Sequence, residues 1–421
     1  MKITKRILSL ILALSVILGT LAFTVSCGDV QIVIGGGSSV QPDSSTSDDS
    51  GKGDSDLPIF IENGNQETDY SELKPVSRGI LSTVRIVAHF ERYIGYGQTS
   101  LSKFKKESSG VIYQLNRETG DAYIITNFHA VYHKDAISTN RISPNIDVYL
   151  YGQEDEAYAI SATYVGGSLT SEIAVLKVSA SEVLKHSHAL AARVADSNAI
   201  SIMDEVFAVG NPEGLGLSVT GGNISVEHDE LSVLAADGKT TLKLRVIRTT
   251  APINEGNSGG GLYNAEGELC GIVVAKKTGD DIDNIAYAIP SNLATLIADI
   301  LIENYTGSVT VGFNKYQLGV TMESAAMTVK VNEYGELVCE ELVSISEIKE
   351  GSVLSGKAEL GDIITSISIN GTSYSVTRIH NVVEAMLKAR LGSTVSLTLL
   401  RGDKTVTVNV TVSEAMSTLV V

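Results

Sequence analysis

The stretch Pro252-Ile-Asn-Glu-Gly-Asn-Ser-Gly-Gly-Gly-Leu262 places one serine, Ser258, among four glycines. So many glycines do not suit the interior of a helix or strand, but they suit a tight loop whose N–H groups converge on one point. Such a loop can form an oxyanion hole, in which backbone donors stabilise the negative charge that develops on a carbonyl oxygen. Taken alone, the stretch is equally compatible with a glycine-rich turn that contains an incidental serine.

The length and composition of the chain favour a β-rich protein of several domains. Its 421 residues are enough for two or three domains. Val, Ile, Thr, Ser and Gly are abundant, aromatic residues make up 5% and Trp is absent, which favours strands. The net charge of −17 argues against nucleic-acid binding and against docking on anionic lipid. Three cysteines, Cys27, Cys270 and Cys339, are too few and too far apart for a disulfide framework or a zinc site, and we expect no cofactor.

The first 27 residues have the pattern of an export signal. A basic start at residues 2–6 precedes an almost unbroken apolar run, Ile7 to Phe23. The following Thr24-Val-Ser-Cys27-Gly resembles a bacterial lipobox, in which the cysteine is lipidated, with Thr where Leu is usual. The run is also nearly long enough for an uncleaved membrane anchor, and simple secretion is a third alternative. Each alternative places most of the chain outside the cytoplasmic membrane, and the first makes Cys27 the lipidation site.

Three further regions follow this signal. Residues 28–75 are rich in Ser, Gly and Asp and lack apolar periodicity, which predicts a disordered acidic linker. Residues 76–306 contain short strands separated by turn signals, a spacing typical of a sandwich or of barrels. Residues 307–415 contain strands and one helical segment, Thr377–Arg390. In this last region we interpret Arg401-Gly-Asp-Lys404 as a hairpin turn and not as an adhesion motif.

A serine nucleophile needs a neighbouring base, and the base needs a group that orients it. His129 directly follows an expected strand, in Thr126-Asn-Phe-His-Ala-Val, where the rim of a barrel would present it. Glu172 directly precedes a strongly apolar expected strand, in Glu172-Ile-Ala-Val-Leu-Lys, and is the candidate orienting acid. Each residue alone is also compatible with an ordinary role, because the chain has seven histidines and a carboxylate at the start of a strand commonly faces solvent.

Other residues are weaker candidates for this chemistry. Asp147 and Asp155 could replace Glu172, but neither precedes an apolar strand in the same register. His133 lies four residues after His129, as in some metal-binding helices. No Glu follows His129 directly and no third ligand is evident, so we expect no metal site.

Six segments, in this order and at compatible spacing, resemble the HtrA/Deg family of trypsin-like serine proteases. They are Thr126-Asn-Phe-His-Ala-Val, Glu172-Ile-Ala-Val-Leu-Lys, Ala208-Val-Gly-Asn-Pro-Glu-Gly-Leu, Ser218-Val-Thr-Gly-Gly, Gly256-Asn-Ser-Gly-Gly and Ala286-Tyr-Ala-Ile-Pro290. The chain order of His, acid and Ser is that of the chymotrypsin fold. The part after Val309 resembles the PDZ domain of that family, with Leu318-Gly319-Val320 as its carboxylate-binding loop. The resemblance extends from about residue 76 to the C-terminus.

The resemblance implies a mainly β fold, in which a chymotrypsin-like double β-barrel is followed by a PDZ domain. The active site would lie in the cleft between two six-stranded barrels, with His129 and Glu172 from the first and Ser258 from the second. His129 would take the proton of Ser258 and return it to the leaving amine. The N–H groups of Gly256 and Ser258 would form the oxyanion hole. Relatives assemble as trimers, so the resemblance also implies a homotrimer or a larger assembly.

Four departures from the family pattern bear on activity. Glu172 stands where the family has Asp, so its extra methylene has to be accommodated if the carboxylate is to reach the imidazole. Glu255 and Gly261 stand where relatives have proline, and Asn223 replaces an apolar residue, so we expect a looser oxyanion loop. These departures keep an alternative function open, that of a catalytically weak scaffold, chaperone or sensor that binds peptides through its PDZ domain.

The expected specificity pocket has no charge at its base. Pro252, six residues before Ser258, takes that position, so no carboxylate is placed to bind Lys or Arg. We therefore expect cleavage after small or medium apolar residues, which unfolded chains expose. The expected function is an extracytoplasmic endopeptidase that degrades misfolded or unfolded exported proteins. Its expected partners are unfolded polypeptides, C-terminal or apolar peptides at the Leu318–Val320 loop, and the membrane through the N-terminal lipid or anchor.

Overall fold

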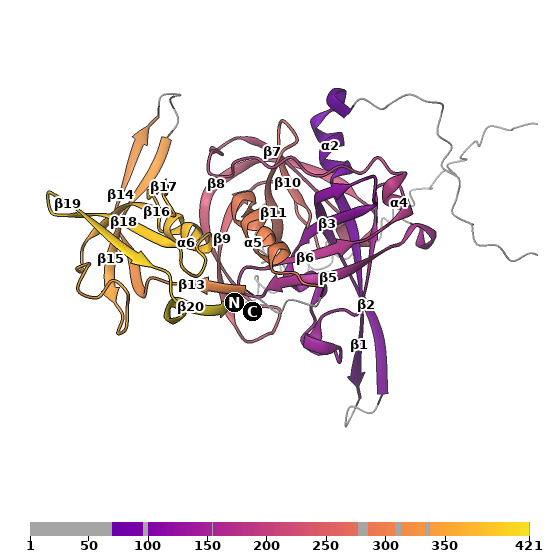
Figure 1. Cartoon of the computed structure of the whole chain (residues 1–421). Coiled ribbons are helices and arrows are strands. Elements are labelled where there is room, and N and C mark those ends of the chain that lie inside the picture. Colours follow the sequence, from indigo (N-terminus) through magenta and orange to yellow (C-terminus); the bar gives the residue numbers. More distant parts are fainter. Residues whose placement is uncertain are drawn as a thin grey trace, which may run out of the picture. The chain divides into compact units, whose positions relative to one another are not determined.

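The computed structural model describes residues 70–420, apart from 96–99, 154, 277–284, 308–312, 333, 334 and 336. Strands predominate, and Figure 1 shows them gathered in two barrels and a further sheet. The prediction of a mainly β chain with a double β-barrel is confirmed. The expected export signal, Cys27 and most of the expected linker lie outside the described residues. In the part of the chain that is described, no helix is both long and apolar enough to cross a membrane.

The first barrel contains six antiparallel strands in the spatial order β1-β2-β3-β6-β5-β4, and it closes because β4 pairs with β1. The strands are β1 Thr83–Ile94, β2 Ser100–Asn116, β3 Asp121–Thr126, β4 Asn145–Tyr149, β5 Ile160–Ser168 and β6 Ile173–Val178. The helices around this barrel are α2 Pro75–Leu81, α3 Phe128–Val131 and α4 Glu182–Lys185, with 3₁₀ turns at Tyr70–Glu72, Thr139–Arg141 and Glu156–Tyr158. Aliphatic side chains fill the core, and Ile86, Ile124 and Leu176 are among those that are almost completely buried.

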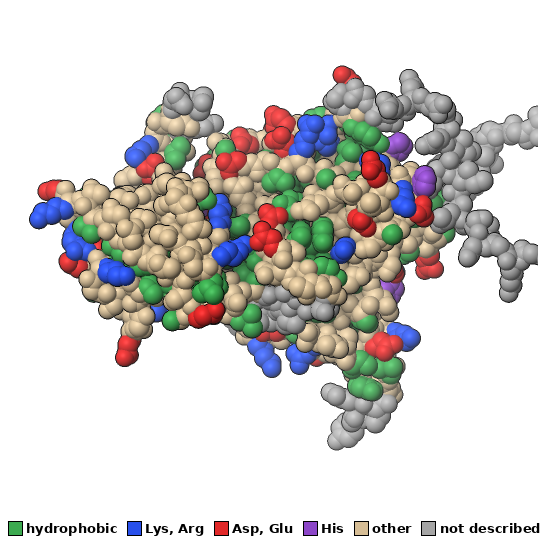
Figure 2. Space-filling view, viewed as in Figure 1, with side chains coloured by type: hydrophobic (Ala, Val, Ile, Leu, Met, Phe, Trp, Pro, Cys, Tyr) green, Lys and Arg blue, Asp and Glu red, His purple; other side chains and the backbone are tan. Residues whose placement is uncertain are grey.

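The first two strands extend beyond this barrel as a long ribbon. β1 and β2 pair along the whole length of β1 without a register shift. Near the tip, the side chains of Tyr93, Ile94 and Leu101 are about half exposed. Figure 2 shows apolar side chains gathered at this tip, at the lower right of the view. The ribbon thus presents an apolar end that the barrel core does not cover.

The second barrel has the same construction, with the order β10-β11-β12-β9-β8-β7 and closure by pairing of β7 with β10. The strands are β7 Glu205–Gly210, β8 Ser218–Leu234, β9 Thr241–Thr249, β10 Gly261–Asn264, β11 Leu269–Lys276 and β12 Ala286–Pro290, with a 3₁₀ turn at Pro212–Gly214. Helix α5, Ser291–Glu303, packs on β11 and also on β6 of the first barrel. Its fully buried residues Ala294, Ile297, Ala298 and Leu301 have the spacing of one apolar helix face, so α5 joins the two barrels.

The C-terminal region has a core of its own. Its main sheet has the order β14-β15-β16-β18-β19, β17 pairs with β16, and β13 pairs with β20. The elements are β13 Phe313–Tyr316, β14 Val320–Val331, β15 Leu337–Ile348, β16 Ile363–Ile369, β17 Thr372–Ser375, α6 Ile379–Leu387, β18 Thr394–Arg401, β19 Lys404–Thr411, a 3₁₀ turn Glu414–Met416 and β20 Ser417–Val420. The Arg-Gly-Asp segment forms the turn between β18 and β19, so its interpretation as a hairpin turn is confirmed.

Candidate active site

Glu172 stands directly before β6 with its backbone in the left-handed region. Its φ is 54°, which is uncommon for a residue other than glycine. The side-chain amide of Asn127 donates a hydrogen bond to the Glu172 carbonyl oxygen at 3.0 Å, which fixes this peptide. The Glu172 side chain is only 5% exposed. The chain therefore holds a buried carboxylate here by means of an unusual backbone conformation.

His129 lies in α3, the four-residue helix that follows β3. Its Nδ1 is 2.9 Å from Oε2 of Glu172, and its backbone N–H donates to the same oxygen at 3.3 Å. Because a carboxylate accepts hydrogen bonds, the contact assigns the imidazole proton to Nδ1 and leaves Nε2 as the acceptor. The extra methylene of Glu172 is thus accommodated, and the imidazole has the tautomer that a general base requires.

The alternative acids and the second histidine have other contacts. Asp147 lies 2.9 Å from Nε2 of His89 on β1, and Asp155 accepts a hydrogen bond from a backbone N–H two residues later. His133 packs edge-on against Phe104, with ring centroids 4.7 Å apart. Among the described residues, no group of three or more His, Cys, Asp or Glu side chains is placed to hold a metal ion. Of the three carboxylates considered, only Glu172 therefore has a hydrogen bond to the His129 imidazole among the described residues.

The loop that contains Ser258 is attached to the first barrel through Ser109 of β2. The Ser109 N–H donates to the carbonyl oxygen of Ser258 at 2.9 Å, and its hydroxyl donates to that of Gly256 at 2.7 Å. The same hydroxyl accepts a hydrogen bond from the N–H of Asn211 at 2.8 Å. Nothing in the sequence around Ser109, which directly precedes Gly110 in the strand, marks it for this role. The Ser258 loop is therefore fixed by hydrogen bonds from a different barrel.

The candidate oxyanion donors are oriented by the peptide before them. The carbonyl oxygen of Glu255 accepts a hydrogen bond from the N–H of Glu213 at 2.7 Å. Because the peptide is trans, the N–H of Gly256 must point away from Glu213. Neither this N–H nor that of Ser258 has a hydrogen bond to another described residue. Gly256 has a φ of 93°, and a Cβ on it would lie 2.0 Å from the carbonyl oxygen of Asn211, so only glycine fits.

Comparisons with known proteins identify the family of the chain. A family model described as a trypsin-like peptidase domain matches residues 108–272. The serine protease Do-like HtrA of Lactococcus lactis subsp. cremoris (strain MG1363) is 28% identical over 369 residues, which cover 83% of each chain. The serine protease Do-like HtrB of Bacillus subtilis (strain 168) is 32% identical over 313 residues, which cover 73% of this chain and 62% of that protein. The chain belongs to the HtrA/Deg family of trypsin-like serine proteases. The family resemblance seen in the sequence is therefore confirmed, and the protein is a serine endopeptidase.

A solved structure confirms the fold of this HtrA/Deg protein. The HtrA-type protease AlgW with decapeptide superposes with a TM-score of 0.51 at 22% sequence identity. The superposition covers 81% of this chain and 97% of that one. At this identity the similarity concerns the fold alone.

The Ser258 hydroxyl does not point at His129, as the nucleophile of a serine protease does during catalysis. It donates a hydrogen bond to the carbonyl oxygen of Val274 at 3.3 Å. No hydrogen bond joins Ser258 to His129 in the described part of the chain. A rotation about the Cα–Cβ bond of serine moves the hydroxyl between staggered positions at low cost, and catalytic hydrogen bonds often tighten only when substrate binds.

Pro252 lies in the segment that approaches Ser258. Its side chain is exposed, and its carbonyl oxygen accepts a hydrogen bond from the Thr220 hydroxyl at 2.7 Å. The next residue, Ile253, is buried in the core of the second barrel. The position expected at the base of the specificity pocket is therefore uncharged and held by a neighbouring strand, β8.

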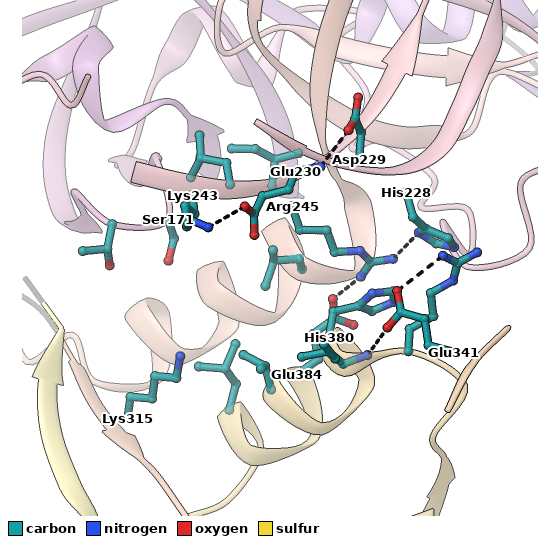
Figure 3. A pocket seen from close by; sticks show the side chains of 18 of the residues that line it. Ser171, His228, Asp229, Glu230, Lys243, Arg245, Lys315, Glu341, His380 and Glu384 are labelled. Atoms are coloured by element: carbon teal, nitrogen blue, oxygen red, sulfur yellow. Dashed lines mark hydrogen bonds and ion pairs between the residues drawn. The ribbon is translucent and has the colours of Figure 1, made fainter. Parts of the chain in front are cut away.

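A cavity of about 470 Å³ lies between the second barrel and helix α6 of the C-terminal region (Figure 3). Arg245 of β9 forms an ion pair with Glu384 of α6, and the rings of His228 and His380 lie 4.9 Å apart. Burial and the neighbouring Arg245 lower the pKa of both imidazoles, so that both are neutral at pH 7. Ser171, which precedes Glu172, also lines this cavity, but Ser258 does not. The cavity is therefore separate from the candidate nucleophile.

Proposed function

We propose that this HtrA/Deg protease cleaves misfolded or unfolded exported proteins with Ser258 as nucleophile, His129 as base and Glu172 as the orienting acid. The observation that carries the proposal is the 2.9 Å contact between His129 and a buried Glu172, on a scaffold whose second barrel presents Ser258. In this mechanism His129 Nε2 takes the Ser258 proton as the hydroxyl attacks the scissile carbonyl. The N–H groups of Gly256 and Ser258 then stabilise the oxyanion.

The test uses a fluorophosphonate probe and the cleavage of unfolded casein. We expect the wild type to be labelled and to cleave casein, and we expect Ser258→Ala to lose both. Glu172→Gln should lose about four orders of magnitude in kcat, because it leaves the imidazole without its orienting carboxylate. Asp147→Asn is the matched control, since it neutralises the other carboxylate considered for this role. Full activity of Ser258→Ala, or an Asp147→Asn loss equal to that of Glu172→Gln, would refute the assignment.

The proposed substrate preference follows from Pro252. An uncharged position at the base of the pocket cannot pair with Lys or Arg, whereas small or medium apolar side chains lose little on entering it. Unfolded proteins expose such side chains, which folded proteins bury. Mass spectrometry of casein fragments is the direct test: the residues before the cut should be Val, Ala, Ile or Leu. A majority of cuts after Lys or Arg would contradict the proposal.

The C-terminal region supports a second part of the proposal, that it binds peptide C-termini as a PDZ domain. β14 is an edge strand, and α6 packs beside it. The loop Leu318-Gly319-Val320 begins this strand, with Gly319 at a φ of 74°. The N–H groups of Leu318 and Gly319 have no hydrogen bond to another described residue, so they can donate hydrogen bonds to the terminal carboxylate of an added strand. Solved structures of the HtrA-type protease AlgW hold a decapeptide or a tripeptide.

Peptide binding can be measured independently of catalysis. In Ser258→Ala protein, we expect a fluorescent hexapeptide with an apolar last residue and a free carboxylate to bind. The amidated form of the same peptide should bind at least tenfold more weakly, because it lacks the charge that the loop N–H groups would hold. Equal affinity for both forms would exclude this mode of recognition.

The location and assembly of the protease are further parts of the proposal. Relatives in Brucella are named probable periplasmic serine endoproteases, which supports an extracytoplasmic location for this chain. A lipid on Cys27 would anchor it to the membrane, and trimers or larger assemblies are expected. Cell fractionation of Cys27→Ala separates the alternatives: release from the membrane supports the lipid, and retention supports an uncleaved anchor. Light scattering of the purified protein gives the number of subunits.

One observation favours the alternative function of a catalytically weak scaffold, chaperone or sensor. The Ser258 hydroxyl contacts the carbonyl oxygen of Val274 and not His129. If this geometry persisted with substrate, the fluorophosphonate probe would not label the protein although the peptide would still bind. Labelling of the wild type at a rate above that of Ser258→Ala excludes the alternative.

A further inference from the structure

Lys106 of β2 projects toward the helix that presents His129. Its ammonium donates a hydrogen bond to the carbonyl oxygen of His129 and lies 3.5 Å from that of Tyr132. Helix α3 has only four residues, so it has almost no internal hydrogen bonds to hold its shape. Its carbonyl groups at the C-terminal end depend on partners from elsewhere, and a lysine is a favourable one because it is both a donor and a cation.

The surroundings of Lys106 are unusual for a lysine. The side chain is half-buried and lies on the same face of β2 as Phe104 and the buried Ser108. Burial lowers the pKa of the Lys106 ammonium, and attraction by the Glu172 carboxylate opposes this effect. Burial lowers the pKa of His133, in the segment after α3, and the Lys106 cation lowers it further.

The titratable and charged groups around Lys106 come from three parts of the first barrel. Glu172, directly before β6, is the carboxylate that attracts it. His129 and His133 come from α3 and the segment after it, and Arg92 of β1 lies over the ring of Phe104. Across the β1–β2 pairing, Lys106 faces the neutral Ala88. A desolvated cation beside the acid of a catalytic pair affects both the position and the charge balance of that pair.

Two neighbouring lysines of the same strand show that this placement is specific. Lys103 and Lys105 lie on the opposite face of β2, with side chains that are 81% and 58% exposed. They pair with Glu91 and Glu107 and not with the turn of His129. Lys103 is therefore a matched control, since it has the same chemistry in the same strand without the burial.

We propose that Lys106 is a positioning residue of the protease, which fixes the backbone of His129 against Glu172 and balances the charge of that carboxylate. The ammonium ties the end of α3 to β2, so the imidazole keeps its 2.9 Å contact with Glu172. Its positive charge also partly cancels the negative potential that Glu172 produces at the imidazole. This inference rests on the proposed roles of Ser258, His129 and Glu172.

The test compares Lys106→Met, Lys106→Arg and Lys103→Met in full pH profiles of peptide cleavage. For Lys106→Met we expect kcat to fall by about 10- to 100-fold, the size of effect that a displaced catalytic group produces. KM should change less than about twofold, because Lys106 does not line the substrate cleft in this proposal. Removal of the cation leaves the Glu172 charge less compensated beside the imidazole, so the acidic limb of kcat/KM should move to higher pH.

Lys106→Arg should recover most of kcat and return the acidic limb to its wild-type position, because it restores the cation and its donors. Lys103→Met should have the kcat of the wild type and the same position of the acidic limb. A Lys106→Met enzyme with wild-type kcat, or one whose loss is the same at every pH and is not recovered by Lys106→Arg, would overturn the proposal. If Lys106→Met does not fold, Lys106→Gln removes the charge but keeps an N–H donor, and the same shift of the acidic limb is required of it.

The test separates this inference from the proposed function. If Ser258→Ala and Glu172→Gln retain activity, the proposed triad is wrong, whatever Lys106 does. If both variants are inactive while Lys106→Met behaves like Lys103→Met, the triad stands and the positioning role is wrong.

Discussion

Shortening the carboxylate at position 172 tests whether the structure holds it at its working distance. Glu172→Asp removes one methylene and withdraws the oxygen by about 1.5 Å, the length of one C–C bond. The distance from Oε2 to His129 Nδ1, 2.9 Å in the wild type, would then become about 4.4 Å, beyond hydrogen-bonding range. A misplacement of about 1 Å can cost about 100-fold in rate. We therefore expect kcat/KM to fall by about 100-fold, equivalent to about 2.7 kcal/mol, although relatives have Asp here.

The assay measures kcat/KM on one apolar peptide for the wild type, Glu172→Asp and Glu172→Gln. The glutamine variant, which lacks the carboxylate, should lose about 10⁴ in kcat/KM and sets the lower limit. The kcat/KM of the aspartate variant should lie between this limit and the wild-type value. Thermal unfolding of each variant separates a catalytic loss from a loss of fold. An aspartate variant as fast as the wild type, or faster, would refute the reasoning, because it would mean that the longer side chain is not at its working distance.

Three further predictions concern the loop and the C-terminal region. Ser109→Ala leaves the N–H of Asn211 and the carbonyl of Gly256 without their shared partner. We expect the free energy of unfolding to fall by about 1–3 kcal/mol and labelling by the fluorophosphonate probe to slow. An unchanged labelling rate would contradict the role of Ser109 in the loop. Gly261→Pro, which introduces the proline of relatives, should lower the melting temperature, because a Cβ there would lie 2.4 Å from the ring of Tyr263; a higher melting temperature would contradict this. Arg401 pairs through two hydrogen bonds with the buried Asp362 and lowers the pKa of that carboxyl group. The ion pair therefore stabilises the folded state above about pH 4, and this contribution is lost as the pH falls through the folded-state pKa of Asp362. In urea unfolding, Asp362→Asn should therefore be about 1–3 kcal/mol less stable than the wild type at pH 7, and this difference should shrink as the pH falls through the folded-state pKa of Asp362; a constant difference would argue against the ion pair.

The spacing of the strands predicted a sandwich or barrels, and the family resemblance narrowed this prediction to two barrels. Several barrel strands, such as β3, β6 and β12, are short and apolar, and the six family segments fall within strands, at their ends or in the loops beside them. His129 and Glu172 could be named as candidates for the same reason, since each adjoins a recognisable strand. Their contact depends on the pairing of β3 with β6, which brings Thr126 opposite Ala174. A pairing of this kind involves residues far apart in the chain, and the sequence alone does not contain its register.

The contacts that hold the Ser258 loop were harder to predict. The absence of proline at positions 255 and 261 favoured a looser loop, since proline restricts the backbone locally. The structure holds this loop through distant contacts, namely the hydrogen bond from Glu213 to the Glu255 carbonyl and those made by Ser109. At Gly261, the ring of Tyr263 occupies the space that a side chain would need. Local propensity is therefore an incomplete guide to how this loop is held, because it takes no account of tertiary contacts; the looser loop stays a prediction.

The two residues that the sequence analysis did not identify, Lys106 and Ser109, lie three positions apart on β2. Because side chains alternate along a strand, they face opposite sides, one toward α3 and His129 and the other toward the Ser258 loop. Three residues of strand span about 10 Å, so this short piece of β2 holds both the base and the nucleophile loop within one rigid element. A shift of β2 by one residue against β1 would exchange the two faces and release both contacts. The position of His129 relative to Ser258 therefore depends on the register of β2 with both of its neighbours, β1 and β3.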